Sequence, residues 1–407
     1  MKKLLSDDQS IFSGQHSEKE TQTADRAIGE VSRGFKTVFG REPQKICFAP
    51  GRVNLIGEHT DYNGGYVLPC AIDLGIYCAA ARRSDRTLRL YSDNFQSSPI
   101  MSYDLDELSL QGCWSDYAVG VIKAMNVVGY ILDRGADFYF HSTLPDGAGL
   151  SSSAALELSV GVMLRSLYML PLTGQELALL GKTAENRFIG VNCGIMDQFA
   201  SSMGKRGNAI LLSSNDLRYK YAPLGDIAVV IVNSGVKHSL ASSAYNDRRR
   251  ECDNARNMLG VTSLCSLNKE EFDKRSDVIT DSVCLRRARH AVYENRRTLD
   301  AAAALEKGDY KEFGRLMNES HASLRDDYEV SCEELDFLAD FSQGFSGVYG
   351  SRMTGGGFGG CTVSLMPFDI VPEYTVAVKE AFLRRFKTDP PVYCITASDG
   401  AQIIKED

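Results

Sequence analysis

Four side chains that can exchange hydrogen bonds with a polar ligand lie close together near the N-terminus. The stretch GRVNLIGEHTDYNGG at residues 51–65 holds Arg52, Glu58, His59 and Asp61 between glycines. Carboxylates accept hydrogen bonds, a guanidinium donates them and an imidazole can do either, so this loop suits a ligand with several hydroxyl groups. The alternative interpretation is a solvated hairpin whose charges have no ligand, and both interpretations stay open at this point.

A second segment, LPDGAGLSSSAA at residues 144–155, places a glycine-rich turn directly before a predicted helix. The free N–H groups of a first helical turn and the helix dipole together form an anion site. Small residues let a phosphate approach the backbone, and the hydroxyls of Ser151 to Ser153 can reach phosphate or Mg²⁺. The segment lacks the Gly-Lys-Ser/Thr ending of a Walker A loop. A serine that only caps the helix is the alternative.

A third segment, SRMTGGGFGGC at residues 351–361, matches the pattern G-x-G-x-x-G at Gly355, Gly357 and Gly360. A dinucleotide-binding fingerprint needs a helix after these glycines. Here residues 361–365 alternate like a strand, so we reject an NAD-dependent enzyme. The sequence favours a tight loop beside a ligand, and a purely structural turn is the alternative.

Two carboxylates lie between the second and third segments. Glu185 is near the end of a predicted helix, and Asp197 follows the loop at residues 190–194. Taken alone, each is typical of a surface acid or a helix cap. Lys237, His238 and Tyr245 are uninformative in isolation, and the run at residues 248–250 is typical of a solvated helix face.

The elements that must position these residues follow from periodicity and turn signals. Asn63-Gly64 predicts a hairpin turn. Helices are expected at 27–39, 150–169 and 174–190 and over most of 242–345. Strands are expected at 46–51, 66–69, 76–80, 87–91, 137–142, 209–212, 227–232, 347–349 and 361–365. The pattern shifts near 213–225, where we place a domain boundary.

The composition narrows the class of protein. The chain has 407 residues, of which 43% are hydrophobic and 24% charged, and its net charge is −8. This length suggests about two or three domains. Nucleic-acid binding needs a basic surface and is disfavoured. The eleven cysteines are odd in number, scattered and without a CxxC pair, which favours a reducing compartment. We expect no secretory leader and no membrane span, and we expect a cytoplasmic monomer.

The three segments together, in this order and spacing, resemble the galactokinase family of the GHMP kinase superfamily. GRVNLIGEHTDYNGG at 51–65 resembles the family's own signature, LPDGAGLSSSAALE at 144–157 the ATP-phosphate loop, and GSRMTGGGFGGCTV at 350–363 the third motif. CGIMDQF at 193–199, HSLASSAYNDRRREC at 238–252 and DYEVSCEELD at 327–336 are also similar. The resemblance covers about residues 30–407.

The resemblance implies an α+β fold of two domains, 1–215 and 216–407, with the active site in the cleft between them and an extension of unknown role at 1–30. The implied reaction converts ATP and α-D-galactose to galactose 1-phosphate, the entry step of the Leloir pathway. Asp197 would be the catalytic carboxylate, with Arg52 beside it. The sugar would contact Glu58, His59, Asp61, Gly194, Asp197 and Tyr245. ATP would contact Gly147, Ala148, Gly149, Leu150, Ser151, Ser152, Ser153, Trp114 and Tyr117, and Ser153 and Glu185 would hold Mg²⁺.

These implied roles agree with the chemistry of the residues. Phosphoryl transfer depends mainly on positioning and charge stabilisation. Mg²⁺ prefers oxygen ligands, commonly one carboxylate with phosphates and waters. An arginine does not readily deprotonate, so Arg52 would act through its charge.

Two positions depart from the family. Lys237 stands where an arginine is common, and lysine lacks the bidentate geometry. Residues 63–66 vary a loop tip that is often Asn-Asp-Gly, so sugar specificity could extend beyond galactose. Two alternatives therefore stay open: a related sugar 1-kinase, such as one for N-acetylgalactosamine, and a sensor that binds galactose and ATP without turnover. The intact Ser151–Ala155 segment, Asp197 and Arg52 speak against the sensor.

Overall fold

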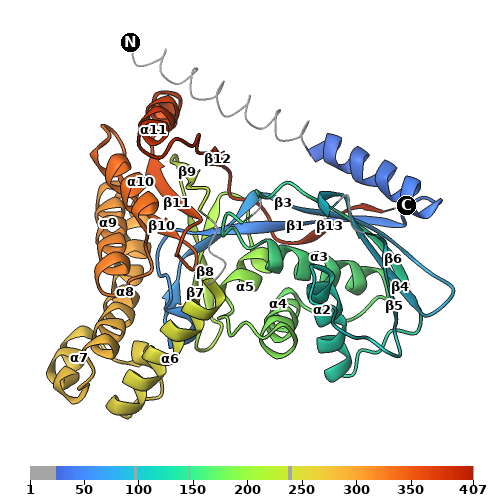
Figure 1. Cartoon of the computed structure of the whole chain (residues 1–407), viewed down its shortest axis with the longest axis horizontal. Coiled ribbons are helices and arrows are strands. Elements are labelled where there is room, and N and C mark those ends of the chain that lie inside the picture. The colour runs from blue at the N-terminus through green and yellow to red at the C-terminus, as the bar shows by residue number, and fades with distance from the viewer. Residues whose placement is uncertain (1–23, 96–98, 146, 237–240, 407) are drawn as a thin grey trace.

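The computed structural model describes residues 24–95, 99–145, 147–236 and 241–406. A six-stranded sheet crosses one half of the molecule in the order β13-β1-β3-β6-β4-β5 (Figure 1). Its strands are β13 (Gln402–Glu406), β1 (Lys45–Asn54), β3 (Pro69–Arg82), β6 (Ala136–Ser142), β4 (Thr87–Ser92) and β5 (Met101–Asp104). All neighbours are antiparallel except β4 and β6. Since β13 pairs with β1, the end of the chain returns to its first strand.

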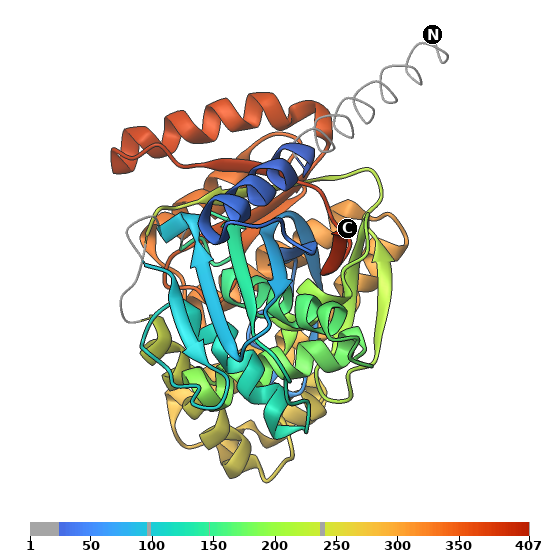
Figure 2. The same ribbon diagram turned by 90° about the vertical axis from the view of Figure 1, so that its right-hand side faces the viewer.

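This sheet is covered on both faces, which explains the nearly continuous apolar sequence of β3. Side chains alternate between faces along a strand. Cys78 and Ala80 belong to the main core with the helices beneath the sheet. Tyr77 and Ala79 pack on the other face against Val31 and other apolar residues of the helix at 24–39. Figure 2 shows this helix lying across the strands.

Four helices cover the face that carries the site. They are α2 (Ser115–Val127), α3 (Ser152–Leu167), α4 (Gly174–Thr183) and α5 (Met196–Met203). A capping box between Thr173 and Glu176 starts α4. The same helix continues as a π-helix, η3 (Ala184–Ile189), which ends at Gly190 in a left-handed conformation. Wide helical turns of this kind are frequent at functional sites.

A four-stranded sheet organises the other half, in the order β10-β11-β9-β12. Its strands are β10 (Gly350–Thr354), β11 (Cys361–Met366), β9 (Ala228–Asn233) and β12 (Val392–Ile395). The inner strand β9 is buried on both faces. Val230 and Val232 pack with residues of α10 and α11, whereas Val229 and Ile231 belong to the main core.

The helices of this half are α6 (Ala241–Leu259), α7 (Lys269–Arg275), α8 (Ser282–Glu306), α9 (Tyr310–Asp326), α10 (Glu333–Gly344) and α11 (Val371–Phe386). A small sheet contains β2 (Tyr66–Val67), β7 (Asn208–Ser213) and β8 (Tyr219–Pro223). Short 3-10 helices are η1 (Asp61–Asn63), η2 (Asp93–Phe95), η4 (Leu264–Ser266), η5 (Ser276–Val278) and η6 (Phe368–Ile370). The boundary expected near residue 215 falls between the paired strands β7 and β8, and it stays a prediction.

Two local predictions were wrong. Asn63-Gly64 does not form a two-residue hairpin turn: Gly64 ends η1 in a left-handed conformation, and the Asn63 side chain donates to the His59 carbonyl at 2.8 Å. Residues 347–349 are not a strand, because the strand before the third glycine loop is β10. The loop is nevertheless followed by strand β11, which confirms that it is not a dinucleotide-binding turn.

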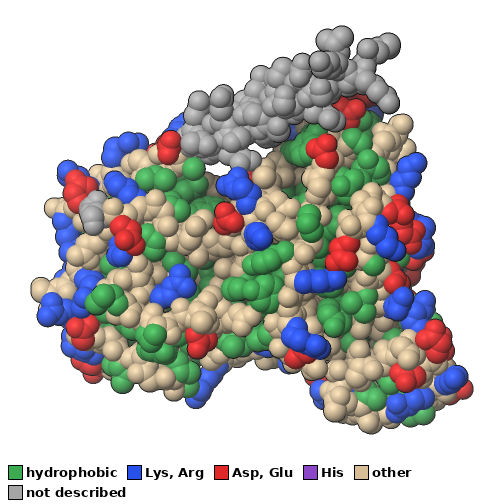
Figure 3. Space-filling view, turned by 180° about the vertical axis from the view of Figure 1, so that it is seen from behind, with side chains coloured by type: hydrophobic (Ala, Val, Ile, Leu, Met, Phe, Trp, Pro, Cys, Tyr) green, Lys and Arg blue, Asp and Glu red, His purple; other side chains and the backbone are tan. Residues whose placement is uncertain are grey.

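The surface and the thiols give two further observations. In the view from behind, acidic and basic side chains are interspersed around hydrophobic ones (Figure 3). Within the described ranges, no helix is long and apolar enough to pass through a membrane. All eleven cysteines are free thiols.

Candidate active site

A cavity of about 390 Å³ lies between the two halves of the chain. The sequence-predicted residues that line it are Arg52, Glu58, His59, Asp61, Tyr117, Gly147, Ala148, Gly149, Leu150, Ser151, Ser152, Ser153, Glu185, Gly194, Asp197 and Tyr245. The third glycine loop contributes Gly355, Gly356, Gly357 and Phe358. Segments that are far apart in the sequence therefore meet around one space, and the three chemical motifs face one another.

One predicted residue, Trp114, does not line this cavity. Its ring stacks on Phe95 with centroids 5.9 Å apart and meets Phe140 edge-on at 5.8 Å. Its buried indole N–H has no hydrogen-bond partner among the described residues. Tyr117, three residues later on α2, does reach the cavity, so the two predicted adenine-site aromatics are separated.

The centre of the site is an ion pair between β1 and the first turn of α5. Nε of Arg52 donates to Oδ1 of Asp197 at 2.7 Å, and Nη2 donates to Oδ2 at 2.9 Å. Arg52 is buried, and Nη1 donates to the Gly149 carbonyl at 2.7 Å. Burial opposes the charge of Arg52, but Asp197 and Glu58 outweigh it and raise the pKa of the guanidinium.

The loop at residues 147–153, which the sequence predicts to be a phosphate loop, is built from backbone conformations that favour glycine. Gly147, Gly149 and Ser151 have φ values of 67°, 70° and 61°. Ser151 occupies the N-cap position of α3, yet its side chain makes no capping hydrogen bond. Its hydroxyl donates to Oδ2 of Asp197 at 2.6 Å. The interpretation of a plain serine cap therefore does not hold for Ser151.

The third glycine loop packs directly on the phosphate loop. A Cβ atom added to Gly355 would lie 3.1 Å from the Gly149 carbonyl oxygen, and one added to Gly360 would lie 3.3 Å from the Ala148 oxygen. Side chains at these positions would force the two loops apart. The glycines thus permit close contact between two backbone segments beside the cavity.

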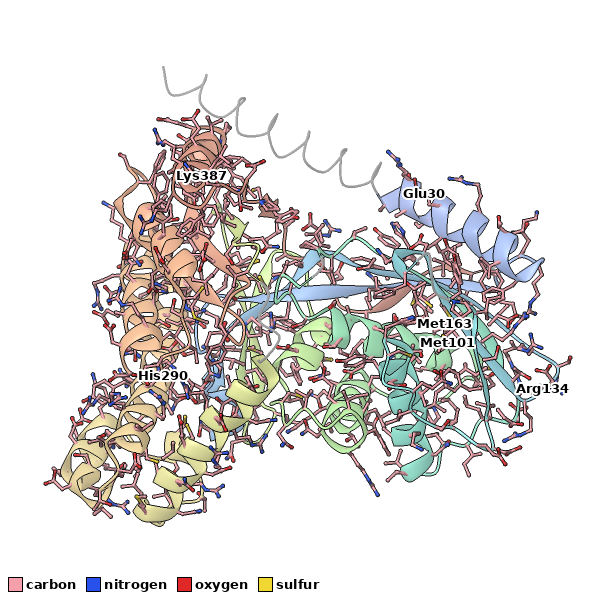
Figure 4. The ribbon with its side chains drawn as sticks, in the orientation of Figure 1. Glu30, Met101, Arg134, Met163, His290 and Lys387 are labelled. Carbon is pink, nitrogen blue, oxygen red and sulfur yellow. The ribbon has the colours of Figure 1, made fainter. Side chains whose placement is uncertain are left out.

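Glu58 connects the first segment to the third. Its Oε1 accepts from the Gly355 N–H at 2.6 Å and lies 3.4 Å from Nη1 of the buried Arg352. The carbonyl of Glu58 lies 3.1 Å from Nε2 of His290, which is on α8 (Figure 4). Glu58 therefore anchors the loop as well as lining the cavity.

The His59 imidazole is held by a contact within its own loop. His59 has a left-handed backbone with φ of 62°, and its Nδ1 lies 2.8 Å from the Tyr62 hydroxyl. Burial lowers the pKa of His59 well below the usual range, and the nearby His290 and Arg248 add to this effect. The imidazole is therefore neutral at pH 7.

Asp61 faces the loop at residues 190–194. A Cβ added to Gly194 would lie 1.7 Å from Oδ2 of Asp61, so any larger residue there would displace the Asp61 carboxylate from its present position. Burial, and then the charges of Asp197 and Glu58, raise the pKa of Asp61 to about 6. Burial and Asp61 also raise the pKa of Tyr245, which keeps its hydroxyl protonated and able to donate.

The end of the cavity at Ser153 and Glu185 is acidic. Burial raises the pKa of Glu185, and Asp197 adds to this effect, while hydrogen bonding with Cys193 and Ser153 opposes it. Among the described residues, no group of three or more His, Cys, Asp or Glu side chains could hold a metal ion by itself. A hydroxyl and a buried carboxylate do fit Mg²⁺, which commonly completes its shell with phosphates and waters.

Sequence reasoning missed two residues behind this end of the site. Glu157 is buried on α3, and Nε2 of Gln198 donates to its Oε2 at 3.1 Å. Burial and the charge of Glu185 raise the pKa of Glu157 well above its usual value. The signal was available, because Glu157 is four residues after Ser153 and shares its helix face. Lys237 and His238 lie outside the described residues.

The chain is similar to known proteins in both sequence and structure. A galactokinase galactose-binding signature matches residues 33–82, a GHMP kinase N-terminal domain residues 116–205, and a GHMP kinase C-terminal domain residues 301–381. A galactokinase of Clostridium acetobutylicum is 46% identical over 385 residues, which cover 93% of this chain and 99% of that protein. The chain belongs to the galactokinase family.

Other members of the galactokinase family agree with this assignment. A galactokinase of Ligilactobacillus salivarius is 45% identical, covering 92% of this chain and 99% of its own. The crystal structure of Lactococcus lactis galactokinase complexed with galactose matches with a TM-score of 0.90 and 42% identity, over 92% of this chain and 99% of that one. Methanococcus jannaschii mevalonate kinase, at 18% identity and a TM-score of 0.63, shares the fold, over 88% of this chain and 100% of that one. The expected two-domain α+β GHMP kinase fold is confirmed.

Proposed function

We propose that the protein carries out the reaction of its family through the Arg52–Asp197 pair, transferring the terminal phosphoryl group of ATP to the C1 hydroxyl of α-D-galactose. The observation that carries this assignment is the position of the pair. It is bonded to the phosphate loop through Gly149 and Ser151, and it shares the cavity with the sugar-side residues. A carboxylate placed there can take or orient the proton of a hydroxyl that attacks phosphorus.

The two substrates occupy different parts of the cavity in this proposal. Residues 147–153 bind the phosphates of ATP, through backbone N–H groups at the start of α3 and through serine hydroxyls. Tyr117 lies on the same side of the cavity. Trp114 does not line the cavity, so it would affect ATP binding only through its neighbours. Glu58, His59, Asp61, Gly194 and Tyr245 form the sugar side, where neutral donors and carboxylate acceptors match the hydroxyls of a hexose.

Ser153 and Glu185 are the residues that would hold Mg²⁺. The ion would neutralise charge on the phosphates of ATP. Besides burial, the charge of Asp197 raises the pKa of Glu185, and a cation at this position would offset that repulsion. The protein would supply the hydroxyl of Ser153 from α3 and the carboxylate of Glu185 from η3.

Arg52 supports the reaction without exchanging a proton. Its guanidinium fixes the plane of the Asp197 carboxylate through two parallel hydrogen bonds, a geometry that lysine cannot reproduce. Its positive charge also offsets negative charge that develops as the phosphoryl group moves. Since it is bonded to both Asp197 and Gly149, it sets the distance between the carboxylate and the phosphate loop.

One assay tests the proposal most directly. ATP consumption is measured with Mg²⁺ against a panel containing galactose, N-acetylgalactosamine, glucose and mannose, and NMR locates the phosphorylated carbon. We expect turnover with galactose and phosphate on C1. Preference for N-acetylgalactosamine would favour the related sugar 1-kinase, and binding without turnover would favour a sensor. Phosphate on C6 would contradict the placement of the C1 hydroxyl at Asp197.

The free thiols, the second substrate and the composition of the cavity bear on where the enzyme is located and on its oligomeric state. The eleven free thiols are typical of a reducing compartment, and ATP is the second substrate, so we infer a cytoplasmic location. We also infer that the protein acts as a monomer on two small molecules, because the residues assigned to both substrates come from a single chain.

A further inference from the structure

Arg249 does not line the cavity, yet it contacts two loops that do. Its Nη1 donates to the Asn192 carbonyl at 2.5 Å. Its guanidinium carbon lies 5.9 Å from the centre of the Tyr62 ring, a separation at which a cation is attracted to an aromatic face. Asn192 belongs to the loop at residues 190–194, and Tyr62 belongs to the loop that carries His59 and Asp61.

The three successive arginines of α6 have three different environments, contrary to the sequence-based expectation of one solvated face. Nε of Arg248 donates to the Tyr328 carbonyl at 2.8 Å, within the same half of the chain. Arg250 is exposed and pairs with Asp247 at 2.9 Å, one turn earlier on the same helix. Successive helical side chains point in different directions, so Arg249 alone of the three is directed at Asn192.

The contacts of Arg249 lie next to the residues assigned to the sugar. Tyr62 follows Asp61 and shares a hydrogen bond of 2.8 Å with His59. Asn192 is two residues before Gly194, which fits against Oδ2 of Asp61 with no room for a Cβ. Tyr245 is four residues before Arg249, and therefore on the same face of α6. Figure 1 shows α6 between the helical lobe on the left and the helices α4 and α5.

We propose that Arg249 is a positioning residue for the sugar side of the site. It ties the loops carrying Asp61 and Gly194 to the helix carrying Tyr245, and so sets their separation. Small displacements of groups that orient a substrate can cost about 100-fold in rate, so loss of a single tether has a measurable effect. This inference rests on the proposed function only in assigning the sugar to this end of the cavity.

The test compares Arg249→Ala and Arg249→Lys with Arg250→Ala, a matched control from the same helix. For each variant we measure kcat, KM for the sugar, KM for ATP and the thermal midpoint of unfolding. We expect Arg249→Ala to raise KM for the sugar about tenfold, with KM for ATP and the unfolding midpoint close to those of Arg250→Ala. Lysine still donates to a carbonyl and keeps the charge, so Arg249→Lys should recover part of the loss.

Two results would overturn the inference. An unchanged KM for the sugar in Arg249→Ala would show that the tether does not position the pocket. Equal increases in both KM values would show a general structural role. Where Arg249→Ala folds poorly, Arg249→Met, which keeps the length of the side chain but has no charge and no N–H donor, replaces it in the comparison. The sugar used is whichever one the parent enzyme phosphorylates in the hexose panel, so failure of galactose as substrate is seen in the parent and is separate from failure of Arg249 as a positioning residue.

Discussion

Arg52 holds both carboxylate oxygens of Asp197, with Nε–Oδ1 at 2.7 Å and Nη2–Oδ2 at 2.9 Å, although the two residues are 145 positions apart. The third nitrogen of the same guanidinium is bonded to the Gly149 carbonyl. One rigid, planar group therefore fixes the position of the candidate catalytic carboxylate relative to the predicted phosphate loop. Ser151 contributes a further hydrogen bond to Asp197 at 2.6 Å, so the carboxylate is oriented from two sides.

Replacing Asp197 by asparagine tests its catalytic role. The amide keeps the shape of the carboxylate but cannot take a proton, so we expect kcat to fall by about 10²–10⁴-fold, the usual contribution of a positioned base. Galactose binding, measured by calorimetry, should be largely retained. A kcat close to that of the parent enzyme would remove Asp197 from the catalytic step.

Adding one methyl group at Gly194 tests the geometry of the sugar side. In Gly194→Ala the new Cβ would lie 1.7 Å from Oδ2 of Asp61, so the Asp61 carboxylate or one of the two loops must move. We expect a rise of at least tenfold in KM for galactose, with little change in KM for ATP. Gly344→Ala is the control, because a Cβ there meets no atom within 4 Å. Equal effects of the two substitutions would contradict the prediction.

The pH dependence of catalysis reports on Asp61. Because its pKa is raised to about 6, Asp61 becomes protonated below that pH, and one of its two carboxylate oxygens changes from a hydrogen-bond acceptor to a donor. We expect kcat/KM for galactose to fall as the pH drops through about 6, since this ratio reports groups of the free enzyme. Asp61→Asn should have low activity throughout and no such acidic limb. An acidic limb of the same midpoint in Asp61→Asn would assign it to another group.

Glu185→Gln tests the assignment of the Mg²⁺ site. The amide retains the size of the side chain but removes the negative charge that attracts the cation, so we expect the Mg²⁺ concentration for half-maximal activity to rise about tenfold or more. Activity should recover in part at high Mg²⁺. A fall in kcat that added Mg²⁺ does not reverse, with an unchanged midpoint, would show that Glu185 acts in some other way.

A stability prediction concerns His141 and Asp93, which lie outside the site. Nδ1 of His141 is 2.8 Å from Oδ2 of Asp93, and this hydrogen bond raises the pKa of His141. The contribution is present below the unfolded pKa near 6.5 and is lost as the pH rises through the higher folded pKa. We expect Asp93→Asn to lower the free energy of unfolding by about 1 kcal/mol at pH 6. Urea titrations should show a smaller difference at pH 9, and a larger one there would reverse the sign of this argument.

The sequence by itself determined those features that depend on local backbone chemistry. Glycines and serines at 147–153 specify a turn that opens a helix, and such a turn needs no distant partner to be recognised. The buried run at β9 and the strand after the third glycine loop were also predicted correctly, since alternation and apolar length are local properties. Asn63-Gly64 shows the limit of this approach, because the same dipeptide can form a hairpin turn or end a short helix. In this fold it ends η1, with the Asn63 side chain donating to the His59 carbonyl.

Only the tertiary structure decided which of these residues meet. A serine directly before a helix is commonly a cap, but in the fold the Ser151 hydroxyl donates to Asp197. Glu157 and Gln198 form a buried, hydrogen-bonded pair behind Glu185. Arg249 could not be separated from Arg248 and Arg250 by sequence, because all three have the same side chain. Arg249 differs from its neighbours because it donates to the carbonyl of Asn192, 57 residues away in the sequence. Contacts at that separation depend on how the two halves of the chain pack together.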